Sequence, residues 1–175
     1  FQKRHLFFDR ILNEEVYQLE PMFPPDVLNP SLACTDKGSE KSFMVLAAEG
    51  IPDMHLVGAG ASCQCFPLHT YSPDGQHRTE NIKDSALELF RKHYGDRQIT
   101  KEDIFHYIYA VLHPPVYRER FADNLKKELP RIPYAPDFHA YAKIGAQLMD
   151  LHINYESVEP WPLQETINRD TPYTR

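Results

Sequence analysis

Two adjacent prolines, Pro114 and Pro115, divide the most strongly patterned stretch of this sequence into two amphipathic segments. The first segment begins at Thr100, with Asp103 three residues later, a pairing that caps the N-terminus of a helix. A proline lacks the amide hydrogen that a helix interior requires, yet it suits the first helical position. The pair therefore predicts that one helix ends near residue 113 and that another begins at once. The apolar side of the first helix consists of Ile104, Phe105, Ile108, Tyr109, Val111 and Leu112.

The second segment places an apolar side chain at every fourth position, which is typical of one helix face. These side chains are Tyr117, Phe121, Leu125 and Leu129, and Pro130 then ends the helix. Burying each large apolar side chain stabilises a fold by about 1.5–3 kcal/mol. Both apolar faces are therefore predicted to be packing surfaces, so residues 101–133 form a scaffold.

Two further helices are predicted on either side of this scaffold. Asn81 followed by Asp84 can cap one of them, and Gly95 stands where a C-terminal glycine belongs. Asp137 can cap the other, which extends over residues 138–152. The apolar face of this last helix is expected to consist of Tyr141, Ile144, Leu148 and Leu151.

The first half of the chain has the features of short strands. Strands are predicted at residues 5–8, 31–35, 43–49, 50–58 and 63–71. The last four are separated by turn signals, so they indicate one antiparallel or mixed sheet. A proline-rich crossing at 21–31 is expected to be held to the core by Met22, Phe23 and Val27. The turn residues Ser-Pro-Asp-Gly predict an exposed loop at 71–80.

These patterns predict an α+β fold, with a short-stranded N-terminal sheet followed by a helical C-terminal part. The 175 residues fit a single domain with a sheet lobe at about 1–75, a helical lobe at about 81–152 and an extended tail at 153–175. Trp161 is expected to anchor this tail. No apolar run approaches the roughly 20 residues that a membrane-spanning helix needs, so no membrane partner is expected.

The net charge of −6 argues against a free-standing nucleic-acid-binding protein. The charge is uneven along the chain, however. Counting acidic and basic residues gives −5 for residues 1–75, +2 for 76–131 and −3 for 132–175. The middle of the chain is therefore the part that can face a polyanion.

The cysteines Cys34, Cys63 and Cys65 are odd in number and lack the spacing of a disulfide framework. Buried free thiols are the simpler interpretation, and reduced cysteines point to a cytoplasmic location. The more specific alternative is a metal site formed by Cys63 and Cys65 together with His55 or His69. Zinc needs four ligands, and a second cysteine pair is missing.

A helical metal site is a second alternative, since His106 and His113 share a face with Glu102. Exposed or hydrogen-bonded histidines are again the simpler interpretation. The sequence contains no HExxH, GxSxG or Gly-rich phosphate-loop motif. We therefore assign no catalytic residue and no metal ligand.

Two polar loops and one strand edge remain as candidates for binding chemistry. Lysine and arginine reach phosphates or the O6 and N7 atoms of guanine, and glutamine can bond adenine. Loops on a rigid sheet are a common place for such contacts, although solvated surface loops have the same composition. The candidates are Thr35, Lys37, Ser39, Lys41, Gln64, Gln76, His77 and Arg78.

The run DIFHYIYAVLHPPVYRERFADNLKKELPRIP at 103–133 closely resembles the C-terminal specificity region of Type ISP restriction–modification enzymes. Further segments agree in the same order at residues 8–19, 41–58, 64–71, 86–96 and 145–156. The resemblance covers about residues 6–163, which is nearly the whole chain.

This resemblance implies a module of a single polypeptide that also carries a nuclease, an ATP-driven helicase-like motor and an adenine-N6 methyltransferase. The module would bind a short asymmetric sequence in double-stranded DNA for methylation and ATP-dependent restriction by its neighbours. It would not itself be an enzyme. S-adenosylmethionine, ATP and Mg²⁺ would belong to the other domains, and this chain would be a piece of a longer one.

The resemblance does not identify individual DNA contacts, because its longest motif falls on predicted core residues. The candidates above are therefore assigned to DNA binding from loop position and chemistry alone. Alternative phosphate contacts are Arg118, Arg120, Lys126 and Lys127. Two other functions stay open: a docking module that packs on the methyltransferase domain without reading bases, and a metal-dependent enzyme that uses the cysteines or histidines.

Overall fold

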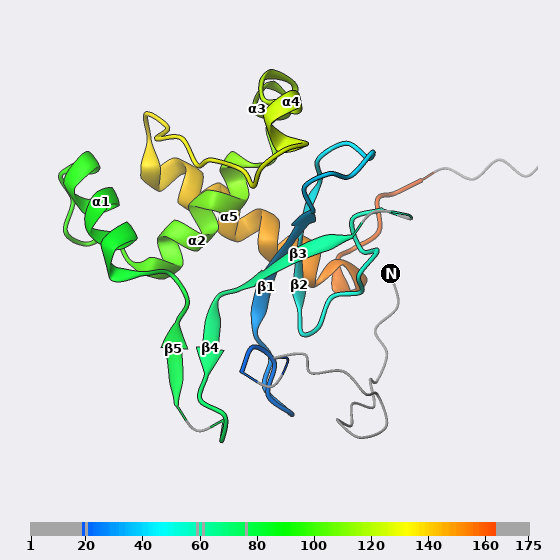
Figure 1. Cartoon of the computed structure of the whole chain (residues 1–175), viewed down its shortest axis with the longest axis horizontal. Helices are drawn as coiled ribbons and strands as arrows, with labels where there is room; N and C mark the ends of the chain where they lie inside the picture. The colour runs from blue at the N-terminus through cyan, green and yellow to red at the C-terminus, as the bar shows by residue number, and fades with distance from the viewer. Residues whose placement is uncertain (1–18, 20, 59, 61, 76, 164–175) are drawn as a thin grey trace, which may run out of the picture.

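A three-stranded antiparallel sheet begins the fold, and helices pack against it (Figure 1). The computed structural model describes residues 19, 21–58, 60, 62–75 and 77–163. The predicted α+β class, with the sheet before the helices, is confirmed. The predicted strand at 5–8 and the last part of the tail lie outside the described residues. No helix in the described part of the chain is long and apolar enough to cross a membrane.

The central strand β1 (Pro30–Thr35) pairs with β2 (Val45–Glu49) on one side and β3 (Cys63–Pro67) on the other. Leu32 lies opposite Ala47 of β2 and Phe66 of β3. Five of the six residues of β1 are buried, because side chains on both of its faces are covered. The predictions of strands at 31–35 and 43–49 are thus confirmed to within two residues.

The strand predicted at 50–58 is wrong, because this segment is a turn. The Asp53 side chain accepts a hydrogen bond from the backbone N–H of His55 at 2.8 Å, which favours a turn over an extended strand. Val57 is nevertheless only 1% exposed, and the Cys63 thiol donates to the Asp53 carbonyl. The segment therefore packs against the sheet without joining it.

The strand predicted at 63–71 is divided after Pro67, and its second part belongs to a separate β-hairpin. Strand β4 (His69–Tyr71) pairs with β5 (Arg78–Glu80) in antiparallel register. The region predicted as an exposed loop is therefore a hairpin, although the exposure of β5 agrees with the prediction. In the proline-rich crossing, Phe23 is buried as expected, whereas Val27 is 36% exposed.

The helices begin close to the predicted positions. Thr100 and Asp103 form the predicted capping box, Asp137 caps the last helix, and Gly95 ends the first with a φ of 67°. Asn81 is not a cap, because its side chain donates to the Pro67 carbonyl instead. The helices are α1 (Asp84–Tyr94), α2 (Lys101–Val111), α3 (Pro115–Arg120), α4 (Ala122–Leu125) and α5 (Phe138–Ile153), followed by the 3-10 turn η1 (Tyr155–Ser157).

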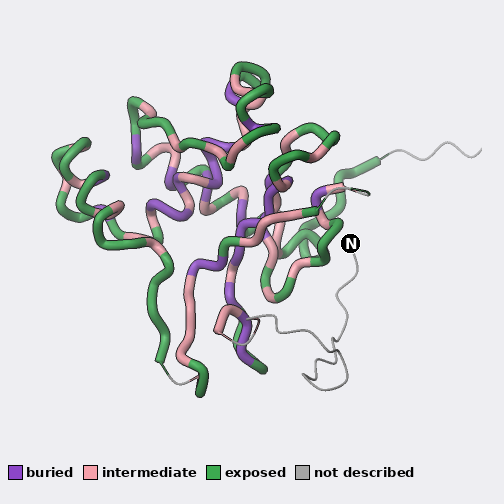
Figure 2. The backbone as a smooth tube through the Cα atoms, viewed as in Figure 1, coloured by how far each residue is buried: buried purple, intermediate pink, exposed green. Residues whose placement is uncertain are grey.

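Helix α2 lies at the centre of the fold and is buried on nearly every side (Figure 2). Tyr107 and Tyr109, two residues apart, are both completely buried. Tyr109 belongs to an apolar cluster with the sheet, α3 and α4, and Tyr107 to a second cluster with α1 and α5. Helix α2 thus connects two hydrophobic cores, which the predicted one-sided stripe did not anticipate.

Only part of the predicted apolar face of α5 is directed to the core, since Tyr141 and Leu148 pack against the two clusters as predicted. Ile144 and Leu151 are 55% and 46% exposed. The buried residues are Phe138, Ala142, Gly145 and Met149. A Cβ atom at Gly145 would lie only 1.9 Å from the backbone oxygen of His106 on α2. The two helices therefore approach closely at Gly145, and Ile144 and Leu151 lie outside this contact.

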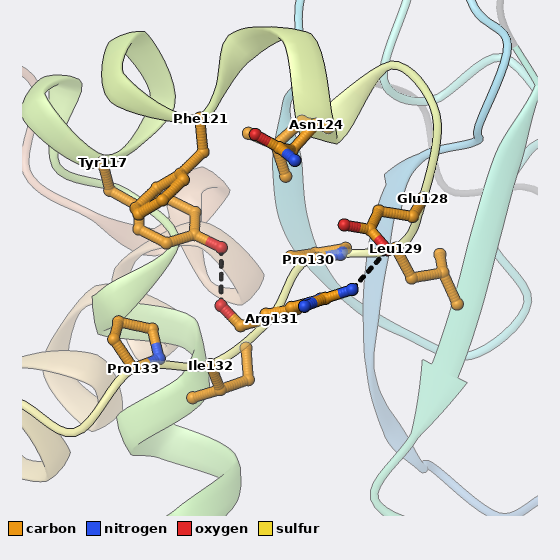
Figure 3. Close-up of a pocket in the computed structure, with 10 residues that line it drawn as sticks. Tyr117, Phe121, Asn124, Glu128, Leu129, Pro130, Arg131, Ile132 and Pro133 are labelled. Carbon is orange, nitrogen blue, oxygen red and sulfur yellow. Dashed lines mark hydrogen bonds and ion pairs between the residues drawn. The ribbon is translucent and has the colours of Figure 1, made fainter.

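The single helix predicted over 115–129 is divided at Phe121 into α3 and α4. Below these helices, the segment 128–133 closes an apolar pocket of about 240 Å³ (Figure 3). The Tyr117 hydroxyl donates to the Arg131 carbonyl at 2.7 Å, and the Arg131 guanidinium pairs with Glu128 at 3.0 Å. These contacts fix the exit from α4.

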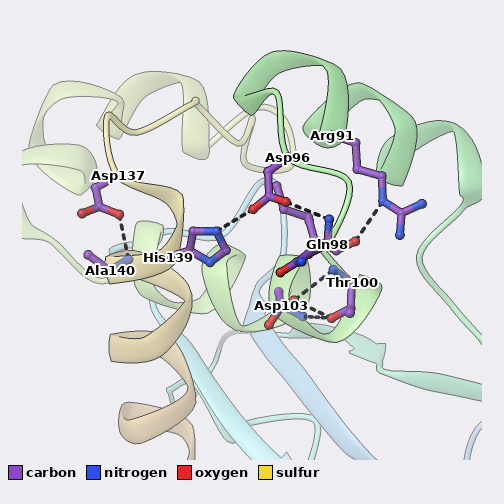
Figure 4. A network of polar contacts seen from close by, with 9 residues as sticks. Arg91, Asp96, Gln98, Thr100, Asp103, Asp137, His139 and Ala140 are labelled. Carbon is purple, nitrogen blue, oxygen red and sulfur yellow. Dashed lines mark hydrogen bonds and ion pairs between the residues drawn. The ribbon is translucent and has the colours of Figure 1, made fainter.

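A polar contact joins the α1–α2 connection to α5 (Figure 4). Asp96 accepts hydrogen bonds from the Gln98 backbone at 2.7 Å and from the His139 ring, whose nitrogen lies 2.8 Å away. Both contacts lower the pKa of Asp96. Trp161, in contrast, is 81% exposed, so the described part of the chain offers it no anchoring site.

The completely buried Tyr109 hydroxyl joins the sheet to α5. It accepts a hydrogen bond from the backbone N–H of Ala47 at 2.9 Å and also contacts the Nδ1 atom of His152. Burial raises the pKa of Tyr109 to about 12 and lowers the pKa of both His113 and His152. When the His152 ring is neutral, its Nδ1 atom can accept a hydrogen bond from the Tyr109 hydroxyl, whereas a protonated ring cannot.

Replacing Gly145 with alanine tests the close approach of α2 and α5. Alanine favours a helix over glycine by about 1 kcal/mol, so without a clash the change would be stabilising. Because the new Cβ would meet the His106 carbonyl, we expect the free energy of unfolding to fall by about 1–3 kcal/mol in urea denaturation. Gln147→Ala, on the exposed face of the same helix, should change stability little. Equal effects of the two variants would contradict this packing.

The Tyr109–His152 contact predicts a loss of stability in acid. A folded state that depresses histidine pKa values binds fewer protons than the unfolded chain, so its stability falls as the pH drops through about 6.5. We expect the urea midpoint to decrease between pH 7.5 and 5.5, and to decrease less in His152→Gln. Gln147→Ala, at an exposed position of the same helix, changes no ionisable group and should keep the wild-type pH dependence. A His152→Gln variant with the full wild-type dependence would rule this explanation out.

Candidate nucleic-acid interface

Thr35, the first of the candidate residues, closes the loop that joins β1 to β2. Thr35 is only 5% exposed, and its hydroxyl accepts a hydrogen bond from the Met44 backbone at 3.0 Å. Carbonyls of Ser42 and Met44 lie 3.5 and 3.4 Å from the same hydroxyl. The polar group of Thr35 is therefore occupied within the loop.

The same loop orders its own backbone through two further side chains. The Ser39 hydroxyl accepts from the Lys41 backbone at 3.1 Å, and the Asp36 carboxylate accepts from the Lys37 backbone at 2.8 Å. The side chains of Lys37 and Lys41 are exposed. The loop is thus fixed by its hydroxyls and its acid, and it presents its lysines to solvent.

Helices α3 and α4 lie against this loop. The Gly38 backbone N–H donates to the Lys126 carbonyl at 2.7 Å. A groove of about 330 Å³ runs between the two segments. Its lining residues are Thr35, Asp36, Ser39, Lys41, Ser42, Phe43, Pro115, Arg118, Glu119, Ala122, Leu125 and Lys126.

The groove therefore brings together cations from two distant parts of the chain. Lys41 comes from the loop, and Arg118 and Lys126 come from the helical segment. These were two separate sets of candidates in the sequence, one for base or phosphate contacts and one for phosphate contacts alone. Lys127 is exposed outside the groove lining, and the Arg120 guanidinium lies 5.5 Å from the centre of the Phe121 ring.

The groove cations make no ion pair with any described residue, which is also true of several exposed cations elsewhere in the fold. Elsewhere, Arg91 pairs with Glu88 and Arg131 pairs with Glu128. Within the groove, the Asp36 carboxylate is bonded to the Ser62 hydroxyl and the Lys37 backbone. The positive charge of Lys41, Arg118 and Lys126 is therefore available to an external anion.

The remaining candidates lie away from the groove. Gln64 is half-buried on β3, an edge strand, opposite Cys34 of β1. His77 and Arg78 lie on the β4–β5 hairpin, at the opposite end of the sheet in Figure 1. Gln76 lies outside the described residues. The predicted residues thus divide between two ends of the sheet.

All three cysteines are free thiols, Cys34 buried and Cys63 and Cys65 half-buried. Burial raises the pKa of Cys34 to about 12, and it also raises the pKa of Cys63 and Cys65. A protonated thiol is a poor metal ligand. Across the residues that the structure places, no three His, Cys, Asp or Glu side chains lie together as a metal site requires.

A family model described as the Type ISP C-terminal specificity domain matches residues 1–175. The fold also resembles solved structures. A DrdV–DNA complex determined by cryo-EM is 44% identical with a TM-score of 0.83, over 95% of this chain and 16% of that chain. A comparison with curated proteins found no match.

Two further structures are similar to this chain. A nuclease-deletion mutant of the Type ISP restriction–modification enzyme LlaGI, in complex with a DNA substrate mimic, is 36% identical with a TM-score of 0.72, over 90% of this chain and 13% of that chain. The ATP-dependent Type ISP restriction–modification enzyme LlaBIII bound to DNA is 26% identical with a TM-score of 0.70, over 87% and 10%. The chain therefore spans less than a fifth of the length of these structures.

The role of Thr35 in closing the loop is tested by Thr35→Val, which preserves the shape of the side chain and removes the hydroxyl. Because the Met44 N–H would lose a buried partner, we expect the free energy of unfolding to fall by about 1–3 kcal/mol. Lys37→Ala, at an exposed position of the same loop, should stay within about 0.5 kcal/mol of the wild type. Unchanged stability of Thr35→Val in chemical denaturation would show that the hydroxyl is free for another role.

Proposed function

The chain belongs to the family of Type ISP C-terminal specificity domains, and from this premise we propose that it binds duplex DNA as a target-recognition module. The three similar structures support this proposal, because each is described as a complex with DNA or with a DNA substrate mimic. The sequence bound would be short and asymmetric, and the bound duplex would be held for adenine-N6 methylation and ATP-dependent restriction by neighbouring domains. The fragment itself would have no catalytic role.

The observation that carries this proposal is the groove with three cations that lack acidic partners among the described residues. The hydroxyls and the carboxylate that order the loop are already hydrogen-bonded within the protein, whereas Lys41, Arg118 and Lys126 form no ion pair with a described residue. A phosphate backbone is the natural ligand for such a set, since lysine and arginine contacts with phosphates supply most of the non-specific affinity for DNA. The acidic balance of the whole chain does not oppose binding at this local site.

The partners and cofactors follow from the family. We propose that the module acts with methyltransferase and helicase domains of the same polypeptide, and that S-adenosylmethionine, ATP and Mg²⁺ bind in those domains. The module would position the duplex, and the chemistry of base flipping and methyl transfer would take place in the neighbouring domain.

A docking role is a second candidate, and the outward face of α5 favours it. Ile144 and Leu151 are exposed there, and large apolar side chains on a surface often mark a protein contact. In this alternative the module packs on the methyltransferase domain and the bases are read elsewhere. Serine replacements at both positions would then reduce methylation without changing the affinity of the groove for DNA.

The groove can be tested by replacing Lys41, Arg118 and Lys126 with alanine in the complete polypeptide. Each phosphate contact contributes about 0.9 to the slope of log affinity against log salt concentration. We therefore expect the triple variant to bind a target duplex more weakly and its slope to be shallower by roughly 2–3, measured by fluorescence anisotropy.

A matched control is Lys143→Ala, which removes an exposed cation from α5 outside the groove. This variant should keep the wild-type affinity and slope. A triple variant that melts normally and retains both the wild-type slope and affinity would overturn the proposed DNA contact and would favour the docking role.

A further inference from the structure

The β4–β5 hairpin is a two-stranded antiparallel ribbon that projects from the body of the fold (Figure 1). It pairs with neither edge of the three-stranded sheet. All of β5 is exposed, and β4 is half-buried. Such a ribbon has the dimensions that the major groove of B-DNA admits.

The base of this ribbon is held by a buried amide. Asn29 is completely buried, and its Nδ2 donates to the carbonyls of Met22 at 2.6 Å and His69 at 2.8 Å. Its Oδ1 accepts from the His69 backbone at 3.2 Å. The Asn81 side chain adds a hydrogen bond to the Pro67 carbonyl at 2.9 Å. The direction of the ribbon is therefore fixed although its tip is exposed.

The acids of the hairpin have partners within the chain. Glu80 lies 3.5 Å from the ammonium group of Lys101. Asp74 accepts a hydrogen bond from the Ser72 hydroxyl and lies 4.0 Å from the His77 ring. Arg78 is exposed and has no ion pair with any residue whose position the structure gives. Arg78 is therefore a cation on the exposed strand of the ribbon without an acidic partner in the described part of the chain.

Strand register places Arg78 directly opposite Tyr71, so both side chains lie on one face of the ribbon. His69 lies on the same face, and its Nδ1 is buried without a hydrogen-bond partner among the described residues. Thr70 and Thr79 lie on the other face. This face of the ribbon thus presents an arginine and an aromatic ring, together with Glu80, which lies opposite His69 and pairs with Lys101.

We propose that the β4–β5 hairpin enters the major groove of the target duplex and that Arg78 contacts a guanine there. This inference rests on the proposed function as a DNA target-recognition module. Arginine can donate two parallel hydrogen bonds to O6 and N7 of guanine, and this pairing distinguishes guanine from the other bases. Tyr71, directly opposite Arg78 in the strand register, would limit the directions in which the guanidinium can point.

The groove at the other end of the sheet is less suited to base reading. The hydroxyls of Thr35 and Ser39 are occupied within the loop, and two of the three groove cations are lysines, which act as point charges rather than as a planar fork. The third, Arg118, is half-buried on α3. Strand β1 separates the two ends by roughly 20 Å, at about 3.3 Å per residue. This distance is shorter than one turn of duplex, about 34 Å, so a single DNA molecule can contact both ends.

The test compares Arg78→Ala with the groove variant of Lys41, Arg118 and Lys126 in the complete polypeptide. The target sequence is first defined by mapping N6-methyladenine in DNA from cells that express the wild-type enzyme. Binding is then measured for duplexes in which each guanine in turn is replaced by 7-deazaguanine, which lacks N7. We expect one such replacement to weaken wild-type binding by about 10-fold or more and to have no effect on Arg78→Ala.

Arg78→Ala should also lose about 10- to 100-fold in affinity for the target and should no longer discriminate at that base pair. Arg78→Lys should not restore this discrimination, because lysine cannot form the bidentate contact. Thr79→Ala, on the opposite face of the same strand, is the matched control and should bind like the wild type.

The two proposals fail in different ways. If Arg78→Ala keeps the wild-type discrimination at every base pair while the groove variant binds weakly, the hairpin inference is wrong and the DNA-binding function stands. If Arg78→Ala and the groove variant both bind like the wild type, the proposed function itself fails. Loss of binding by Arg78→Ala at all sequences equally would make Arg78 a phosphate contact and would overturn the assignment to guanine.

Discussion

The burial of two tyrosines on α2 is the constraint on which the rest of this structure depends. Two tyrosines, two residues apart, carry hydroxyls into the interior, and each hydroxyl must find partners there. The Tyr107 hydroxyl donates to the Pro133 carbonyl at 2.7 Å and accepts from the Ala135 backbone at 2.6 Å. Tyr109 bonds the edge of β2 and the end of α5. One helix thereby fixes the sheet, the exit from α4 and the last helix relative to each other, and the groove between the β1–β2 loop and α3–α4 depends on that arrangement.

The sequence correctly predicted those parts of the fold that depend on contacts between residues close together in the chain. The capping residues Thr100 and Asp137 and the stop at Pro114 need only nearby groups. The buried face of α5 could not be predicted in this way, because it is decided by how closely α2 approaches Gly145. A pattern of large apolar residues indicates the core side only where the neighbouring helix stays at an ordinary distance. The turn at Asp53 is an exception, because its hydrogen bond with His55 is local and the segment was nevertheless predicted to be a strand.

The candidate site shows a similar division. The residue types were evident from the sequence, since lysine, arginine and glutamine in loops are those that contact nucleic acid. The sequence could not indicate that Lys41 lies beside Arg118 and Lys126, because this depends on a backbone contact between Gly38 and Lys126 across a long separation. Nor could it distinguish a hydroxyl that closes a turn, such as that of Thr35, from one that faces a ligand. That difference appears only when burial and hydrogen-bond partners are known.

The hydrogen bonds that hold the hairpin base have a consequence for how such a module can change. Asn29 and Asn81 bond the main-chain atoms of Met22, Pro67 and His69, and only the Lys101–Glu80 ion pair involves a side chain of the ribbon. Main-chain contacts are indifferent to the identity of the residues that make them. The outer residues of the ribbon can therefore be exchanged without loss of the contacts that hold its base and without any repacking of the core.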